Sequence, residues 1–261
     1  MLCAIRDSDK IKVIARSSKK VEGPFYCPGC KREVNVKKGA IKTHHFAHKP
    51  PYKCRYGAGE SDAHRNCKET IFNKLCELPH VSLCELEKNF GDNVADIYAE
   101  INGVPVAIEI QKSDLTVNEI SKRTRTYHEK GIYVLWLCLL DKKLNNQAYS
   151  PKAWEKWLHA VYFGRVYYWL SDLVVVPFHF GDYQTYIESS VWFDSSGHEN
   201  SSGGYFKTSR RYKTPMQGVG INIGSNFKPS YKSAWNSKTI KIPECSIYSD
   251  NLKAWWKDKK K

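Results

Sequence analysis

The stretch VADIYAEINGVPVAIEIQKS, residues 94–113, sets the centre of the fold. Its Asn-Gly pair lies between two runs rich in Val and Ile, and this pattern is the strongest short-range signal for a β-hairpin with a two-residue turn. A type I′ turn at Asn102-Gly103 fixes the register of the strands, and counting outward places Asp96 directly opposite Glu109. Two acidic side chains therefore face each other within a largely apolar hairpin.

The two faces of this hairpin differ in polarity. Asp96, Glu109 and Gln111 share one face, whereas the other is wholly apolar and is expected to be buried. The apolar residues are Ala95, Ile97, Ala99, Ile101, Val104, Val106, Ile108 and Ile110. Facing carboxylates with Cβ atoms about 5 Å apart destabilise a sheet, and a divalent cation such as Mg²⁺ reverses the sign of that interaction. A solvated face with two unrelated acids is the alternative interpretation.

The composition indicates a partner class. The 261 residues include 41 Lys and Arg against 27 Asp and Glu, a formal charge of +14 that makes nucleic acid the expected partner, although charge alone does not separate DNA from RNA. We find no secretory signal pattern and no apolar run that could cross a bilayer, so we expect a cytoplasmic protein without membrane contact. The charge and the lack of a cofactor fingerprint disfavour an enzyme for small molecules.

Residues 1–57 contain a candidate zinc module. Its sequence from residue 24 to 48 is PFYCPGCKREVNVKKGAIKTHHFAH, and two thiolates with two imidazoles fill a tetrahedral structural Zn²⁺ site. The predicted ligands are Cys27, Cys30, His45 and His48. Two alternatives stay open, because His44 could pair with His48 and Cys54 could replace either histidine. The nine cysteines are odd in number and irregular in spacing, which favours metal ligation over a disulfide framework.

Residues 58–145 are predicted to form the main α/β domain. Helical spacing of apolar residues indicates a helix at 60–78, and VSLCELEKN then reads as a strand before the hairpin. A capping box at Thr116-x-x-Glu119 opens a second helix that ends at Gly131, and IYVLWLCLL follows as a buried strand. The element order is α-β-β-β-α-β, with a parallel, right-handed last connection and hence a mixed sheet.

This element order resembles the core of restriction-endonuclease-like nucleases of the PD-(D/E)xK type. In that superfamily, the acid on the second strand and the first acid of the third-strand motif bind Mg²⁺, and a lysine usually follows two residues later. The resemblance maps these three positions onto Asp96, Glu109 and Gln111. This chain thus has glutamine where lysine is usual.

The details resemble the competence protein CoiA-like family over roughly residues 20–140. The matching positions are Cys27, Cys30, His45-Phe-Ala-His48, Glu60-Ser61, His64, Lys68, Ala95-Asp96, Ile108-Glu109-Ile110-Gln111, Ser113, Arg123-Thr124, Tyr127 and Trp136. The resemblance implies a DNA nuclease of the RecB-like branch, linked to processing of incoming DNA in natural transformation, with recombination or defence proteins as partners. Gln111 is then the family's own variant.

The candidate catalytic residues come from the hairpin and the first helix. They are Asp96, Glu109, Gln111, Glu60, His64 and Lys68. Glu60, His64 and Lys68 recur one helical turn apart, so the first two are candidates to join Asp96 and Glu109 at Mg²⁺, and Lys68 is a candidate for the missing cation. Gln111 can orient water or phosphate by hydrogen bonds but supplies no charge.

The candidate nucleic-acid contacts are Arg123, Tyr127 and Lys112. Arg123 and Tyr127 are four residues apart on a helix, where they could clamp a phosphate and stack on a base. A packed tyrosine beside a surface arginine is the alternative. Lys112 is a poorer candidate for the catalytic cation because it points to the opposite face of the strand from Glu109 and Gln111.

Residues 146–261 are predicted to be an aromatic and basic extension, partly packed on the core. SPKAWEKWLHAVYFG indicates a helix, RVYYWL and LVVVPFHF indicate strands, and residues 194–204, DSSGHENSSGG, a loop or linker. The segments KTSRRYK and KAWWKDKKK mix bases with aromatics, as single-strand binders do.

Two other functions fit the same residues. One is a non-catalytic, zinc-containing nucleic-acid binding protein on a degenerate nuclease fold. The other is a histidine-based ββα-metal nuclease within the Cys/His module, which is disfavoured because the module's histidines are expected to be committed to structural zinc. Cleavage of DNA with Mg²⁺ separates the first from a nuclease, and substitution of His44 separates the second.

Overall fold

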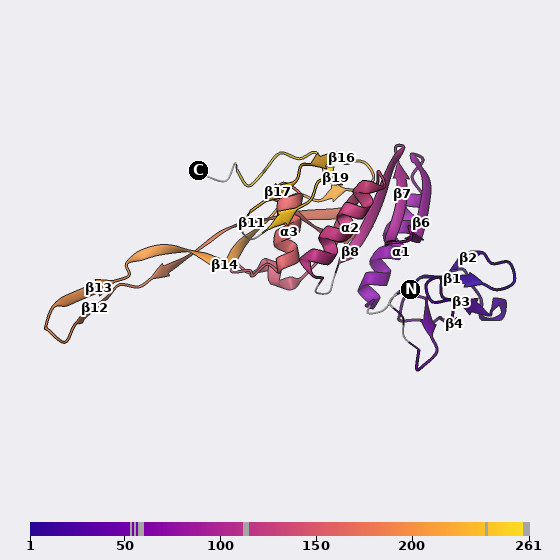
Figure 1. Ribbon diagram of the computed structural model, residues 1–261, viewed down its shortest axis with the longest axis horizontal. Helices are drawn as coiled ribbons and strands as arrows, with labels where there is room; N and C mark the ends of the chain where they lie inside the picture. The colour runs from indigo at the N-terminus through magenta and orange to yellow at the C-terminus, as the bar shows by residue number, and fades with distance from the viewer. Residues whose placement is uncertain (53, 55, 57–59, 112–114, 238–239, 258–261) are drawn as a thin grey trace.

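The computed structural model describes the chain except residues 53, 55, 57–59, 112–114, 238–239 and 258–261. The predicted contact Lys112 and the motif residue Ser113 lie outside this described part. An N-terminal module lies at one end of the long axis, an α/β body in the middle, and a two-stranded arm at the other end (Figure 1). No helix among the described residues is long and apolar enough to span a membrane.

The N-terminal module is a small five-stranded sheet in the order β2-β1-β3-β4-β5. Its elements are β1 (Cys3–Arg6), β2 (Lys12–Ile14), the 3-10 turn η1 (Lys20–Glu22), β3 (Phe25–Tyr26), β4 (Glu33–Lys37) and β5 (His45–His48). Only a few buried apolar side chains form its own cluster, among them Phe25, Val34, Val36 and Phe46. A core of this size stabilises little by burial alone, so the module needs a further constraint.

The central elements follow the predicted order α-β-β-β-α-β. They are α1 (Asp62–Cys76), β6 (Val81–Asn89), β7 (Val94–Ile101), β8 (Val104–Gln111), α2 (Val117–Glu129) and β9 (Tyr133–Leu139). Strands β6, β7 and β8 are antiparallel neighbours, and β9 pairs parallel to β8 after the α2 crossover. The predicted Thr116/Glu119 capping box begins α2, and Ser61, which was not predicted as a cap, begins α1.

The hairpin has the predicted register. Ile101 pairs with Val104, and both turn residues, Asn102 (φ 51°) and Gly103 (φ 75°), have the positive φ of a type I′ turn. Pairing continues outward to Ile97 and Ile108, so the next position places Asp96 across from Glu109. Both faces of the hairpin are covered, since side chains that alternate along β7 and β8 are buried on either side.

The C-terminal part extends the same sheet. The η2 turn (Lys142–Asn145) and α3 (Ala153–Val161) lead into β10 (Val166–Ser171), which pairs parallel to β9, and the order continues through β11 (Val174–Ile187) to β14 (Tyr205–Gln217). The remaining strands are β15 (Ile221–Asn222), β16 (Phe227–Lys232), β17 (Trp235–Asn236), β18 (Lys241–Ile242) and β19 (Cys245–Asp250). β19 pairs parallel to β9, and α3 packs its Trp157 into the common core.

The segment predicted as a loop at residues 194–204 is partly strand. β12 (Ser190–Phe193) pairs with β13 (Glu199–Ser202), and this small hairpin continues the β11–β14 ribbon outward from the body (Figure 1). We call residues 182–213 the arm. The Ser, Asn and Gly content of residues 194–204 is typical of a loop or linker, but cross-strand pairing gives residues 199–202 a regular strand backbone.

The aromatic pair near the C-terminus packs against the body. Trp256 stacks on His179 with ring centroids 4.2 Å apart, and Trp255 lies against Gly218. The described part of the predicted single-strand binding segment KAWWKDKKK therefore uses its tryptophans for packing. The terminal lysines 259–261 lie outside the described residues.

Candidate functional site

Asp96 is held by backbone and by α1. Its Oδ2 accepts a hydrogen bond from the backbone N–H of Ile110 at 2.9 Å and lies 3.2 Å from His64 Nε2. Lys68 Nζ lies 3.4 Å from the other carboxylate oxygen. Although burial alone raises the pKa of Asp96, the charge of Lys68 and the contact with His64 hold it well below its usual value. Asp96 is therefore ionised.

Lys68 is the buried centre of this acidic cluster. Its ammonium group pairs with Glu60, with Glu87 at 2.9 Å and with Asp96, and its side chain is 1% exposed. Burial lowers the pKa of Lys68, but Glu87, Asp96 and Glu60 together raise it well above the usual lysine value. A permanent cation thus lies beside Asp96, on a helix rather than on the strand where the resemblance expects one.

Glu87 connects this cluster to the N-terminal module. Its carboxylate accepts backbone N–H bonds from Leu2 at 2.7 Å and Cys3 at 3.2 Å, in addition to Lys68. The residue is buried and has a positive φ of 49° on β6. No sequence motif singled it out, because an acid within VSLCELEKN gives no sign that it turns inward.

Glu109 has a different set of partners, all from α2. Tyr127 donates its hydroxyl hydrogen bond to Glu109 Oε1 at 2.5 Å, and Arg123 Nη2 lies 2.5 Å from the same oxygen. The Glu109 side chain is 1% exposed. Burial, together with the nearby charge of Asp96, raises the pKa of Glu109 to about 7 against the lowering effect of Arg123 and Tyr127.

The polar groups of Arg123 and Tyr127 therefore bind Glu109 within the protein. Tyr127 is completely buried, and its ring meets Phe90 edge-on, so it is not exposed for stacking on a base. The packed alternative is what the structure shows for this tyrosine. Arg123 keeps a 30% exposed side chain, also bonds the Val94 carbonyl at 3.0 Å, and lies over the Trp136 ring. Gln111 is buried beside Glu109 at the end of β8.

Three of the predicted residues gather as possible metal ligands. One ligand atom from each of Glu60, His64 and Asp96 lies within 4.8 Å of the others, a set of two carboxylates and one imidazole. Oxygen-rich sets of this kind suit Mg²⁺ or Mn²⁺. Glu109 is not part of the group, because its carboxylate is held toward α2. The Glu60 oxygens already contact Lys68 and the Met1 amino group, the latter at 2.9 Å.

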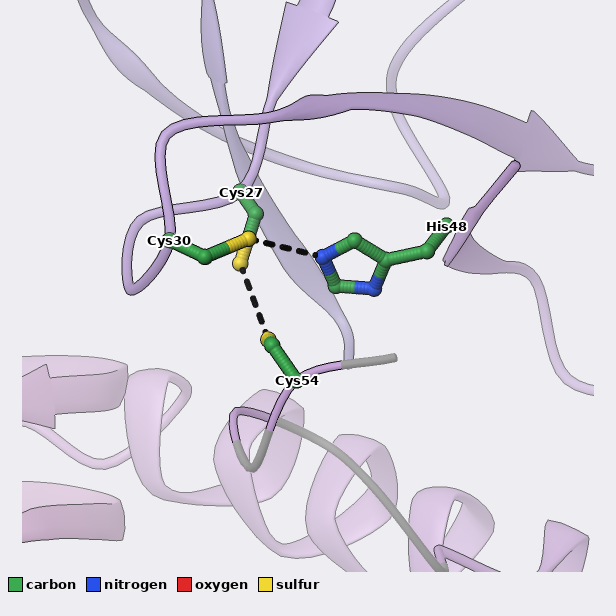
Figure 2. A group of neighbouring side chains, drawn as sticks. All are labelled: Cys27, Cys30, His48 and Cys54. Carbon is green, nitrogen blue, oxygen red and sulfur yellow. Dashed lines mark hydrogen bonds between the residues drawn. The ribbon is translucent and has the colours of Figure 1, made fainter. Parts of the chain in front are cut away.

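A second group of possible ligands lies in the N-terminal module, and Figure 2 shows its four side chains converging. They are Cys27, Cys30, His48 and Cys54. Cys27 and Cys54 Sγ atoms are 3.7 Å apart, and Cys30 Sγ is 3.1 Å from His48 Nε2. Two sulfurs each about 2.3 Å from a tetrahedral zinc would be about 3.8 Å apart. The spacing therefore fits Zn²⁺.

This group differs from the predicted ligand set at one position. His45 is not a member, and its Nδ1 lies 2.9 Å from the Thr43 carbonyl oxygen instead. Both histidines are on β5, where side chains alternate, so residues three apart point to opposite faces. Cys54 takes the remaining place, as one of the alternatives allowed. His44 does not join either group of ligands in the described residues.

Comparison with known proteins agrees with the motifs. The family model for the N-terminal domain of competence protein CoiA matches residues 8–57, and that for its nuclease-like domain matches residues 60–165. The chain belongs to the CoiA-like family. The two matches together extend over more than half of the chain and include both groups of possible ligands.

A curated relative supports this assignment. Competence protein CoiA of Bacillus subtilis (strain 168) is 29% identical over 114 residues, which is 43% of this chain and 31% of that protein. The chain thus matches about a third of the length of this relative. No solved structure matches the chain.

Proposed function

We propose that the protein is a Mg²⁺-dependent deoxyribonuclease with a restriction-endonuclease-like core. The observation that carries the proposal is the hairpin register, which places Asp96 across from Glu109 on the second and third strands of an α-β-β-β-α-β unit. The nuclease-like family match covers this unit. The family also suggests that such cleavage serves DNA processing in competence, recombination or defence.

The proposed ligands of Mg²⁺ are Asp96 and Glu109, with Glu60 and His64 joining from α1. A bound Mg²⁺ would supply activation of a water molecule and neutralisation of charge on the scissile phosphate. Asp96 is suited to permanent binding because it is ionised. Glu109 must give up part of its contact with Tyr127 and Arg123 to turn toward the cation, and Arg123 is then free to contact a phosphate.

Two other residues have supporting roles in this proposal. Lys68 holds Glu60 and Asp96 in place by its central charge, as a positioning residue. Gln111 orients water or phosphate by hydrogen bonds. DNA would also meet a basic groove of about 1050 Å³ in the N-terminal module, whose lining includes Lys37, Lys38 and Lys42.

One observation favours the non-catalytic alternative. Both candidate carboxylates already have protein cations as partners, Asp96 with Lys68 and Glu109 with Arg123. A nuclease fold that has lost its metal would be expected to neutralise its acids in this way. DNA binding without cleavage would then depend on the basic groove and on other surface bases.

Cleavage assays decide between these functions. We expect linear or circular DNA, single- or double-stranded, to be cut by the purified protein with Mg²⁺ and left intact with EDTA. Asp96→Asn and Glu109→Gln should each lower the rate on the order of 100-fold or more, because each removes a carboxylate proposed to bind Mg²⁺. Glu100→Gln is the matched control on the same hairpin, since Glu100 bonds Ser82 and Tyr98 instead.

Other outcomes of these assays would contradict the proposed nuclease function or its proposed site. DNA binding by the parent protein without Mg²⁺-dependent cleavage of any of the four substrates would establish the non-catalytic alternative. Cleavage that survives both substitutions would move the active site elsewhere, and loss of cleavage in a His44→Ala variant would point to the Cys/His module.

We also propose that Cys27, Cys30, His48 and Cys54 hold a structural Zn²⁺. Cys54→Ser should lower the zinc content of the purified protein, measured by elemental analysis, and destabilise the N-terminal module because metal binding drives its folding. His45→Asn is the control and should keep the zinc, since His45 faces away from the site. The opposite pattern would restore the Cys2His2 ligand set.

A further inference from the structure

The arm leaves the body as a ribbon of only two strands (Figure 1). From Asp182 opposite Lys213 to Phe193 opposite Glu199 it is about 40 Å long at 3.3 Å per residue. An isolated two-stranded ribbon is marginally stable in water, because one layer cannot bury its side chains. Something must cover the arm for this geometry to be favourable.

The arm also exposes large apolar side chains along its length. Those at least one-third exposed are Tyr186, Val191, Trp192, Phe193, Tyr205, Phe206 and Tyr212, with Phe193 at 68% and Phe206 at 67%. Contiguous exposed aromatics of this kind mark association surfaces. Burying the exposed parts of these side chains from two arms removes on the order of 1,000 Å² from water, which is the range of specific protein interfaces.

Charge along the arm is arranged in two blocks. Apart from the local pairs of Asp182 with Lys213 and of Asp194 with His198, the outer half carries the exposed acids Glu188 and Glu199, and the inner half carries the exposed bases Lys207, Arg210 and Arg211. Among the described residues, none of these five is in an ion pair with another part of the chain. A ribbon that is acidic outside and basic inside is complementary to a second copy of itself laid in the opposite direction.

We propose that the arm is a dimerisation element, in which two copies of the chain pair their arms antiparallel about a two-fold axis. The acidic outer half of each arm then lies on the basic inner half of the other, and every contact occurs twice, as in any isologous interface. The acids make a nucleic-acid partner less favourable for the outer half, since phosphates would meet Glu188 and Glu199. Arm pairing is independent of whether the core cleaves DNA.

Sedimentation equilibrium of the full chain over a range of concentrations tests this pairing. The parent should be a dimer whose dissociation constant rises with salt. Glu188→Lys with Glu199→Lys, or Arg210→Glu with Arg211→Glu, should each raise that constant on the order of 100-fold, because like charges then face each other. Lys122→Glu with Arg125→Glu is the control, the same charge change as the second pair at exposed positions of α2.

Mixing the two reversed proteins gives the decisive result. The acid-reversed chain has bases at all five of these positions, and the base-reversed chain has acids at all of them except Lys207, so together they should form a heterodimer about as tight as the parent dimer. The substituted side chains are exposed, and circular dichroism of each variant checks that the fold is intact. A monomeric parent, or reversed variants that fail to pair when mixed, would overturn the proposal. A monomeric parent that loses DNA binding on reversal of Arg210 and Arg211 would assign the arm to nucleic acid instead.

Discussion

Asp96 and Glu109 lie across from each other on one hairpin, but their surroundings shift the pKa values of the two carboxylates in opposite directions. On the α1 side, Asp96 is joined by Lys68 and His64, and its pKa is well below the usual value. On the α2 side, burial raises the pKa of Glu109 to about 7 in spite of Arg123. The register places the two acids together, and the surroundings provided by the two helices give their carboxylates different pKa values.

This difference has a functional meaning if the site binds Mg²⁺. The lowered pKa keeps Asp96 an anion at neutral pH, so it can anchor a cation. Glu109 is poised near neutrality and is held by a tyrosine and an arginine, so its availability depends on pH and on the ligand. Pairs of acids with separated pKa values are common where two carboxylates have different tasks.

Removal of Lys68 should cause the largest loss of stability, because it takes away the cation that holds the acids on the α1 side of the hairpin. Lys68→Met leaves Glu60, Glu87 and Asp96 as buried acids without their central cation, and breaking such buried pairs costs about 3–5 kcal/mol of unfolding free energy. The pKa of Asp96 should rise in the variant, because its main lowering charge is gone. Urea unfolding at neutral pH measures the loss.

Lys74→Met on the same helix is the matched control. Lys74 pairs with Glu77 at 2.8 Å, but both side chains are exposed to solvent, so the expected loss is below about 1 kcal/mol. Equal losses in the two variants would show that the α1 side is not held by its buried charge. The contrast between the α1 side and the α2 side would then have no electrostatic basis.

The sequence predicted the backbone positions of the site residues more fully than the contacts of their side chains. Asn102-Gly103 fixed the register because a two-residue turn leaves no freedom for the strands, and the capping box at Thr116 fixed the start of α2. These are local rules that act within a few residues. The positions of Asp96 and Glu109 follow directly from them.

The partners of the two acids could not be predicted in the same way. Lys68 was recognised as a possible cation, but its contact with Glu87 depends on a positive φ within β6 and on the docking of β1. The ligand His45 was chosen by its spacing from His48, and the strand conformation of β5 turns it away. Contacts of this kind depend on how distant elements pack, which periodicity does not encode.

On the α2 side, the raised pKa of Glu109 should make the stability of the protein depend on pH. Because the folded pKa of Glu109, about 7, is above the ordinary glutamate value of 4.5, the native state binds more protons than the unfolded state between these values. Stability from this residue is therefore present at low pH and is lost as pH rises to about 7. Glu109→Gln cannot ionise, so relative to the parent it should gain about 2 kcal/mol between pH 5 and pH 8.

Denaturant unfolding of parent and Glu109→Gln at a series of pH values, without divalent cations, measures this difference. The change of the unfolding free energy with pH, rather than its absolute value, is the informative quantity, since glutamine also removes the charged partner of Arg123. Glu100→Gln should keep the parent's pH dependence. Parallel curves for parent and Glu109→Gln would mean that Glu109 is ionised throughout and that both sides of the hairpin hold anions.

Substitution of His64 should have the smallest effect on stability. It tests whether the α1 side contributes an imidazole ligand to Mg²⁺. Its Nε2 lies 3.2 Å from Asp96 and its side chain is 17% exposed. His64→Gln keeps a hydrogen-bonding group near that position, so the unfolding free energy should change by less than about 1 kcal/mol. If His64 also binds Mg²⁺, half-maximal DNA cleavage should need on the order of 10-fold more Mg²⁺, because one ligand is exchanged for a weaker one. An unchanged Mg²⁺ requirement would limit His64 to orienting Asp96, and the cation would then be held by carboxylates alone.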